Sequence, residues 1–277
     1  MNSGLNRFQK GLNNVTKVLN LITIQQKKGA KYGNYVLGIV SFAAGFITLY
    51  SGFGLGTILL PVYALFLPLT SAISATAIVH LLNNLFKFGL VYKKITWNIV
   101  VRFGITASIF SILGSLLLVS ISGQENLLHQ VIGALIVFFA LFEILPNLRK
   151  IQFSEKLIPF GGVLSGFFGG LSGHQGAFRS MFLLKTGLNK DSYIADGVMI
   201  ALIVDTSRII VYGLSIFSLA SFSQSSSLNM FIVAVLASFA GSFLANKFSN
   251  KITISFIKVL VSVMMLIIGL LLIFQVI

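Results

Sequence analysis

The sequence predicts an all-α membrane protein, a polytopic bundle of transmembrane helices arranged as two related halves. Of its 277 residues, 56% are hydrophobic and only 9% are charged, whereas a soluble domain carries about 25% charged residues. The apolar runs are long and continuous, which favours helices over the alternating strands of a transmembrane barrel. Glycine-rich interruptions fall at corresponding places in the two halves. The 26 glycines and 26 phenylalanines are typical of helices that pack closely and face lipid.

Residues 1–33 are expected to form a basic amphipathic helix on the membrane surface. Their apolar residues recur at spacings of three and four, which places them on one helical face among lysines and an arginine. The alternative is a flexible basic tail. The first long apolar run starts near Tyr35, so we expect it to belong to the mature protein rather than to a cleaved signal peptide. The apolar face consists of Leu5, Phe8, Leu12, Val15, Leu19 and Ile22.

Ten apolar segments follow, and they predict eight membrane units. A helix needs about 20 apolar residues to cross a bilayer. Four segments are shorter and form two adjacent pairs, 35–50 with 57–68 and 158–171 with 176–188, each pair split by a glycine-rich stretch. The six segments that are long enough alone are 72–92, 97–120, 127–145, 192–213, 228–246 and 252–277.

An internal repeat is predicted, with 34–146 as the first transmembrane repeat and 147–277 as the second. Sliding the chain by 121 residues without a gap superimposes the interrupted segments and several polar positions. Ser111 and Gly114-Ser115 are echoed by Ser238 and Gly241-Ser242 at an offset of 127. The superimposed pairs are Gly45 with Gly166, Ser51-Gly52 with Ser172-Gly173, Ser71 with Ser192, Leu81 with Leu202, Asn84 with Asp205, and Lys87 with Arg208.

Two topologies remain open. If each interrupted segment crosses the membrane once, the basic N-terminal segment lies inside, but Lys185, Lys190, Lys247 and Lys251 lie outside. If each forms a re-entrant hairpin, the repeats become inverted and every loop cation lies inside, but the N-terminal segment lies outside. Cytoplasmic loops normally carry the excess of lysine and arginine, so the loops favour the second topology and the N-terminus favours the first.

The two glycine-rich interruptions are the first candidate site. Irregular backbone at membrane depth is costly unless it is buried in protein or lines a cavity. The half-helix that follows each interruption presents free N–H groups and a positive dipole end, which together bind anions. The alternative is that these glycines only permit close helix packing, as we expect for Gly161 and Gly162. The candidates are Ser51, Gly52, Gly54, Gly56, Ser172, Gly173, His174, Gln175 and Gly176.

Charged and amide side chains within the apolar segments are the second candidate site. A charge is expensive in a membrane and is a functional candidate by default. Asp205 and Arg208 are three residues apart and share a helical face, either as part of a site or as an internal ion pair. In the first half, Asn83, Asn84 and Lys87 hold the matching place, so Lys87 and Arg208 could clamp an anion between the halves. Arg179 follows the second interruption and could join them, or could extend to lipid headgroups.

Proton coupling has three candidate residues. His80 and His174 titrate near neutrality when unperturbed, and Asp205 is a carboxylate that lies well inside the apolar segment 192–213. The alternative for each histidine is an interhelical hydrogen bond. A sodium ion would serve equally as the coupling ion.

Other classes of function are disfavoured. The net charge of +14 lies mostly in the N-terminal segment and loops, where it sets topology and meets anionic lipid, so we expect no nucleic-acid partner. The chain has no cysteine, so it has no disulfide or thiolate metal site. It lacks the zinc-protease, serine-hydrolase and phosphate-loop motifs, so we expect no enzyme activity, metal or cofactor. The expected partners are a small anion and the bilayer, and homo-oligomerisation is left open.

Residues 35–275 resemble the sulfite exporter TauE/SafE family of membrane permeases. The resemblance rests on Gly45 and the run Ser51-Gly52-x-Gly54-x-Gly56, on Ala75-Thr76, and on the echo Gly169-Gly170-x-Ser172-Gly173-x-x-Gly176. It implies about eight helices, a bacterial-type cell membrane and transport of sulfur-containing anions such as sulfite or organosulfonates. The chain departs from the family pattern at Leu55 and at His174-Gln175.

The expected function is therefore secondary transport of a small oxyanion by alternating access between two repeats. An anion channel of the same architecture and a non-transporting membrane scaffold are the alternatives.

Overall fold

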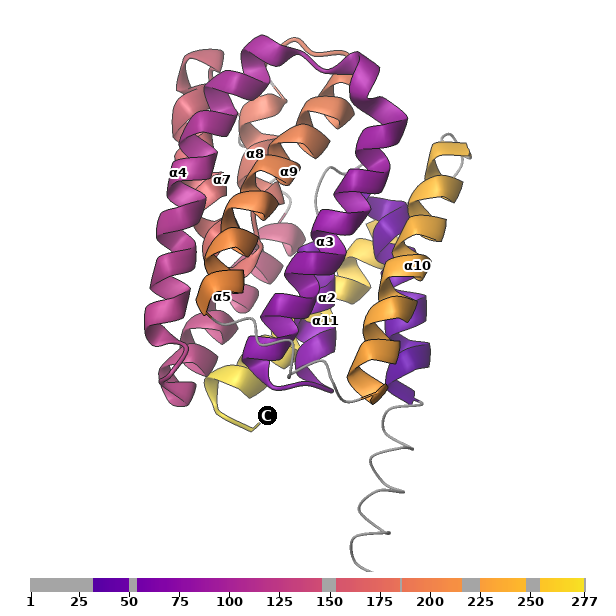
Figure 1. The fold of residues 1–277 in the computed structure, drawn as a ribbon, viewed down its shortest axis with the longest axis vertical. Helices are drawn as coiled ribbons and strands as arrows, with labels where there is room; N and C mark the ends of the chain where they lie inside the picture. The colour runs from indigo at the N-terminus through magenta and orange to yellow at the C-terminus, as the bar shows by residue number, and fades with distance from the viewer. Residues whose placement is uncertain are drawn as a thin grey trace, which may run out of the picture.

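The computed structural model describes residues 32–49, 54–145, 153–184, 186–215, 225–247 and 255–276. Every regular element in these ranges is helical, which confirms the all-α prediction (Figure 1). The predicted surface helix lies outside the described residues, apart from its last two positions. The elements are a helix over Tyr32–Leu49, α2 Leu55–Ala64, α3 Leu69–Val91, η1 Tyr92–Lys94, α4 Trp97–Ile121, α5 Glu125–Ile144, η2 Glu155–Leu157, α7 Ile158–Ser172, α8 Gly176–Leu183, α9 Lys190–Ser215, α10 Ser225–Lys247 and α11 Ser255–Ile273.

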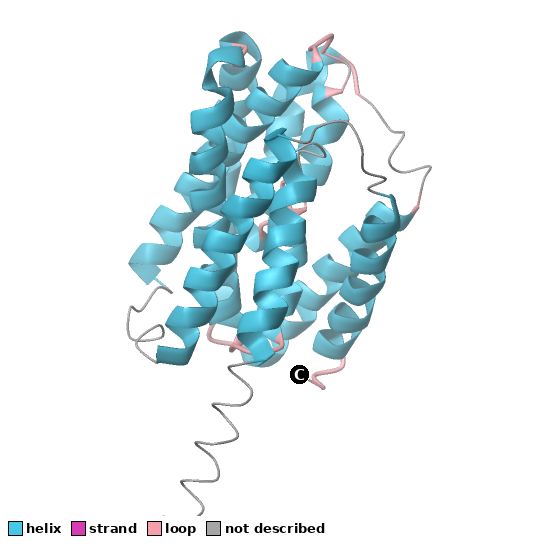
Figure 2. Cartoon of the chain, turned by 90° about the vertical axis from the view of Figure 1, so that its right-hand side faces the viewer, coloured by secondary structure: helices cyan, strands magenta, loops and turns pink. Residues whose placement is uncertain are grey.

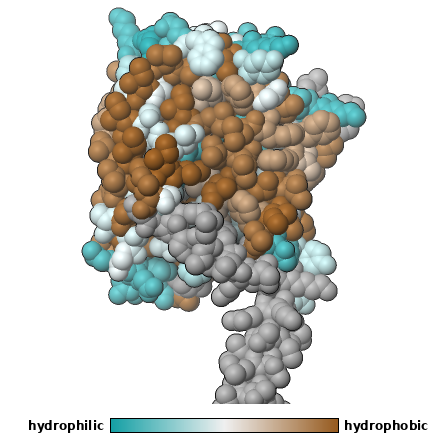
Figure 3. Space-filling view, in the orientation of Figure 1, coloured by the Kyte–Doolittle hydropathy of each residue, from teal (hydrophilic) through white to brown (hydrophobic). Residues whose placement is uncertain are grey.

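The surface of the bundle matches a bilayer. Figure 3 shows a broad hydrophobic band between two hydrophilic ends. Exposed large apolar side chains such as Ile105, Ile109 and Leu116 on α4 belong to the lipid-facing surface. Within the described ranges, five helical stretches are long and apolar enough to cross a membrane. The protein is therefore a membrane protein.

The two helices that flank each glycine-rich interruption run antiparallel and form a hairpin. The first hairpin runs up through the helix Tyr32–Leu49 and returns through α2 (Figure 1). Its two ends lie side by side, because a Cβ on Gly33 would be 3.3 Å from a ring carbon of Phe66, just beyond the end of α2. The second descends through α7 and returns through α8, and the amide of Phe153 donates to the carbonyl of Met181 (3.3 Å). The two hairpins enter from opposite ends of the bundle (Figure 1), and Figure 2 shows the same bundle of helices from the side.

Glycines at the tips allow these reversals. Gly54 precedes α2 with φ of 122°, and Gly173 caps α7 in the left-handed region with φ of 83°. Both conformations cost little for glycine and are strained for residues with a Cβ. The tips meet in the middle of the bundle, because a Cβ on Gly56 would lie 3.1 Å from the carbonyl oxygen of Gly173.

Each hairpin is held by a helix from the other half of the chain. Gly162, Gly166 and Gly170 recur every four residues along α7 and face the backbone of α4, and a Cβ on Gly166 would lie 2.7 Å from the Cα of Ala107. The helix Tyr32–Leu49 packs in the same way on α10, where a Cβ on Gly45 would lie 2.9 Å from the Cα of Ser238. The packing role expected of Gly162 is thus confirmed.

The remaining helices complete the bundle. The helices α5 and α11 approach closely, since a Cβ on Gly133 would lie 2.7 Å from the carbonyl oxygen of Gly269. The helices α3 and α9 pack on each other through the centre. The largest apolar cluster includes Leu59, Tyr63 and Phe139. The polar residues of α3 and α9 are therefore enclosed by apolar packing.

Candidate functional site

A buried polar cluster lies where α3, α9 and the hairpin tips meet. On α3, His80, Asn84 and Lys87 are spaced by four and three residues, so they share one helical face. They are 8%, 5% and 2% exposed. On α9, Asp205 and Arg208 are 0% and 1% exposed. Because buried charges are costly unless they are paired, the partners of each group decide its role.

Asp205 is the centre of the cluster and is bonded through both oxygens. His80 Nδ1 lies 2.6 Å from its Oδ2, and Asn84 Nδ2 donates to the same oxygen (3.1 Å). Gln175 Nε2 donates to Oδ1 (3.0 Å), and the Nη2 of Arg208 lies 2.9 Å from Oδ1. The internal ion pair considered for Asp205 and Arg208 is present. This carboxylate joins α3, α9 and the tip of the second hairpin.

Arg208 is directed to the end of α7. Its Nη1 donates to the carbonyl of Gly169 (3.4 Å), and a Cβ on Gly173 would lie only 2.7 Å from the same nitrogen. A cation near the last carbonyls of a helix is stabilised by the helix dipole. Tyr212, one turn along α9, donates its hydroxyl to the carbonyl of Gly170. Arg208 therefore stabilises the second hairpin tip in addition to pairing with Asp205.

Lys87 and Arg179 are the cations that face a cavity. Lys87 Nζ donates to Thr48 Oγ1 (2.7 Å), and among the described residues no carboxylate lies within ion-pairing distance of it. Arg179 Nη1 donates to Gln175 Oε1 (3.1 Å). Arg179 is 4% exposed, so it does not extend to lipid headgroups.

The cavity between them is small. Its volume is about 20 Å³, enough for about one water molecule. No carboxylate is among its described lining residues, and Arg208 is not among them either. The cluster as a whole has three cations, Lys87, Arg179 and Arg208, against Asp205, a net charge of +2 while the histidines are neutral. The described lining consists of Thr48, Leu49, Leu55, His80, Asn84, Lys87, Arg179, Ile194, Gly197 and Val198.

Some predicted site residues lie outside this cavity. Asn83 faces α10, where its Oδ1 accepts a hydrogen bond from Ser242 Oγ (2.9 Å). His174 is 1% exposed and stacks on Phe139 with ring centroids 4.7 Å apart. Its Nδ1 lies 2.9 Å from Ser172 Oγ, and its Nε2 has no partner within the described part of the chain.

The remaining predicted residues belong to the hairpin tips. Gly54 and Gly56 open α2, and Gly176 opens α8, where its carbonyl accepts from Ser180 Oγ (2.9 Å). Ser51 and Gly52 lie outside the described residues.

Six of the described lining residues were not predicted from the sequence: Thr48, Leu49, Leu55, Ile194, Gly197 and Val198. Thr48 lies next to the end of the helix Tyr32–Leu49 and accepts a hydrogen bond from Lys87. A hydroxyl side chain within an apolar segment is the sequence feature that could have indicated it. Gly197 offers no such signal, because a single glycine in a helix is common. Its place at the cavity follows only from the packing of α9 on α3.

Comparison with known proteins places the chain in a family. The family model described as sulfite exporter TauE/SafE matches residues 37–272, which is most of the chain and includes both hairpins. No curated protein matches the chain. No solved structure matches it. Members of the family are transporters rather than enzymes, in agreement with the sequence prediction. The chain belongs to the sulfite exporter TauE/SafE family of membrane transporters.

Proposed function

We propose that this protein is a secondary transporter that carries a small anion, a sulfur oxyanion or an organosulfonate, across the cell membrane. The observation that carries the proposal is the small cavity lined by the buried Lys87, which has no described carboxylate within ion-pairing distance. A buried cation that faces a cavity is costly unless an anion compensates it. The amide of Asn84 and the hydroxyl of Thr48 line the same space and make its wall polar.

We propose that the two halves, 34–146 and 147–277, are inverted repeats that move against each other. Asn84 and Asp205 are 121 residues apart, the offset that superimposes the halves, and they are hydrogen-bonded to each other. The hairpins enter from opposite ends, and each packs on a helix of the other half. Inverted repeats with interrupted helices near the midplane are a common basis for alternating access.

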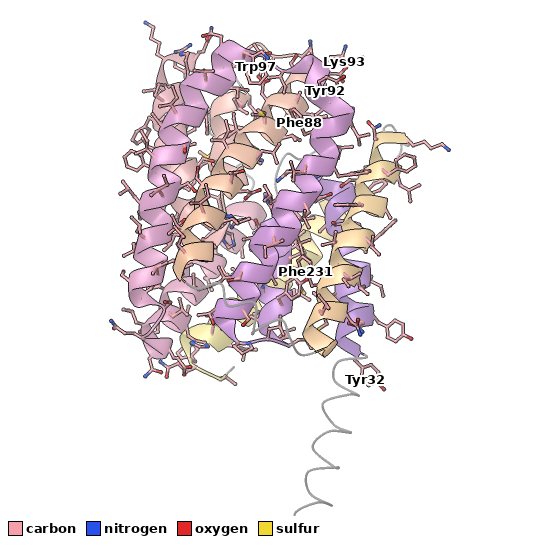
Figure 4. The ribbon with its side chains drawn as sticks, in the orientation of Figure 1. Tyr32, Phe88, Tyr92, Lys93, Trp97 and Phe231 are labelled. Carbon is pink, nitrogen blue, oxygen red and sulfur yellow. The ribbon has the colours of Figure 1, made fainter. Side chains whose placement is uncertain are left out.

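We assign the end of the bundle that carries the loop lysines to the cytoplasm. Lys94 and Lys190 line a common cavity at this end. Figure 4 shows Lys93 and Trp97 at this end and Tyr32 at the opposite one. An excess of loop cations marks the cytoplasmic face.

We propose a proton as the coupling ion, bound by His80 together with Asp205. The two side chains are 2.6 Å apart, and His80 also lines the cavity, so a proton and an anion would be neighbours. His174 lines no part of the described cavity and is the weaker candidate. The charged and titratable groups around His80 are Lys87 on its own helix, Asp205 and Arg208 on α9, and Arg179 on α8.

The test is flux in proteoliposomes that contain the purified protein. Sulfite, thiosulfate, sulfate and a short organosulfonate would be offered with and without an imposed pH gradient. Saturable uptake with counterflow supports a carrier, and acceleration by the gradient supports proton coupling. Unsaturable conductance would identify an anion channel instead. Absence of flux for every anion by folded protein would favour a scaffold role.

A further inference from the structure

A second, wider cavity lies at the lysine-rich end and reaches the wall of the anion cavity. Its volume is about 280 Å³. Leu49 and Ile194 line both cavities. The two spaces are therefore separated by these side chains. The described lining of the wider cavity consists of Leu49, Leu90, Val91, Lys94, Lys190, Asp191, Ile194 and Asn246.

The separating side chains are apolar and come from elements that meet only in the folded protein. Leu49 ends the first arm of the first hairpin and is 3% exposed, and Ile194 lies in the first turns of α9 and is 9% exposed. They pack in one cluster with Val198 and with Ala245 of α10. No hydrogen bond between side chains has to break when these two residues move apart.

The anion cavity is bounded differently next to His80. There His80 and Asn84 are bonded to Asp205, which is in turn bonded to Arg208 and Gln175. Opening in that direction would break charge-assisted hydrogen bonds, each of which is worth more than a neutral one. Displacing two apolar side chains into a space that is already open is the easier change.

We propose that Leu49 and Ile194 form the gate through which an anion passes between the cavity of Lys87 and the lysine-rich vestibule. This inference rests on the proposed transport function. The structure is then a closed state that opens first toward the vestibule. The described charged residues of the vestibule wall are Lys94, Lys190 and Asp191, and their net positive charge favours the entry of an anion.

The chain contains no cysteine, so one introduced thiol reports on one position. Gly197 lines the anion cavity, and a Cβ there would have Arg179 Nε as its nearest neighbour at 3.7 Å, an ordinary contact. The experiment measures the reaction of Gly197→Cys with an anionic, membrane-impermeant methanethiosulfonate in proteoliposomes. Asn246→Cys on the vestibule rim marks the molecules whose vestibule faces the reagent.

The expected result is slow labelling of Gly197→Cys and at least tenfold faster labelling when Leu49→Ala or Ile194→Ala is added. Leu90→Ala is the matched control, because Leu90 lines the vestibule but not the anion cavity, and it should leave the rate unchanged. The two gate variants are independent, so one that fails to fold, as judged by size-exclusion chromatography, leaves the other as the test.

Gate variants that label no faster than the Leu90→Ala control would overturn the proposal. So would Gly197→Cys labelling as fast as Asn246→Cys, because the cavity would then be open. Labelling does not depend on transport, so the gate and the transport function are tested separately. Faster labelling of the gate variants without anion flux would support the gate and contradict the transport function. Anion flux with unchanged labelling would support the transport function and contradict the gate.

Discussion

Replacing Lys87 with glutamine distinguishes a role of this lysine in anion binding from a role in the stability of the fold. Lys87 is 2% exposed, and within the described part of the chain its Nζ donates to one neutral partner, Thr48. A hydrogen bond to a charged group contributes about 1.5–3 kcal/mol, so an anion held by this ammonium should bind about 10- to 100-fold more weakly in Lys87→Gln. Glutamine can still donate to Thr48, and the uncompensated buried charge is gone. The empty variant should therefore be at least as stable as the wild type.

Thermal unfolding in detergent measures both effects. An anion at 100 times its wild-type Kd stabilises the wild type by about 2.7 kcal/mol. At the same concentration, a 10- to 100-fold weaker Kd leaves only about 0.4–1.4 kcal/mol in Lys87→Gln. Lys93→Gln is the control, because Lys93 is an exposed lysine that is not among the described lining residues of either cavity.

Proteoliposome flux completes the comparison. Initial rates against anion concentration should show a higher KM for Lys87→Gln and an unchanged KM for Lys93→Gln. The reasoning is refuted if folded Lys87→Gln retains wild-type flux and the full stabilisation by the anion. A lower melting temperature of the empty variant would also contradict it, because Lys87 would then be stabilising the fold.

Three further predictions follow from the same contacts. Asp205→Asn should lower the free energy of unfolding by about 3–5 kcal/mol, because it leaves the buried charge of Arg208 uncompensated. Adding Arg208→Gln should restore part of that loss in a double-mutant cycle, and additive losses would contradict the pairing. Gly166→Ala should lower the free energy of unfolding by about 1–3 kcal/mol, because the added methyl group forces α7 away from α4. Gly89→Ala should not destabilise the protein, since a Cβ there has nothing within 4 Å. Equal melting temperatures of the two variants would contradict the close packing of α7 on α4. His80→Gln should abolish acceleration of uptake by a pH gradient while leaving counterflow; retained acceleration would exclude His80 as the proton site.

The local features of this protein could be predicted from its sequence. Hydropathy and helical period are properties of neighbouring residues, so the apolar segments and the all-α class follow directly. The positions of the hairpin tips could be predicted from glycine-rich stretches, because Gly54 and Gly173 adopt the positive φ that the reversals need. Asp205 and Arg208 are three residues apart, so their common face and ion pair were available as well.

The partners of those residues were decided only by the tertiary structure. A spacing of three or four identifies a helical face but not what that face meets, so Asn83 turns to α10 while Asn84 turns to Asp205. For the same reason Arg179, rather than Arg208, shares the cavity with Lys87. Whether each interrupted segment crosses the membrane or returns depends on packing between distant helices. The sequence therefore determined which residues are buried and polar, and long-range packing decided which of them share a cavity.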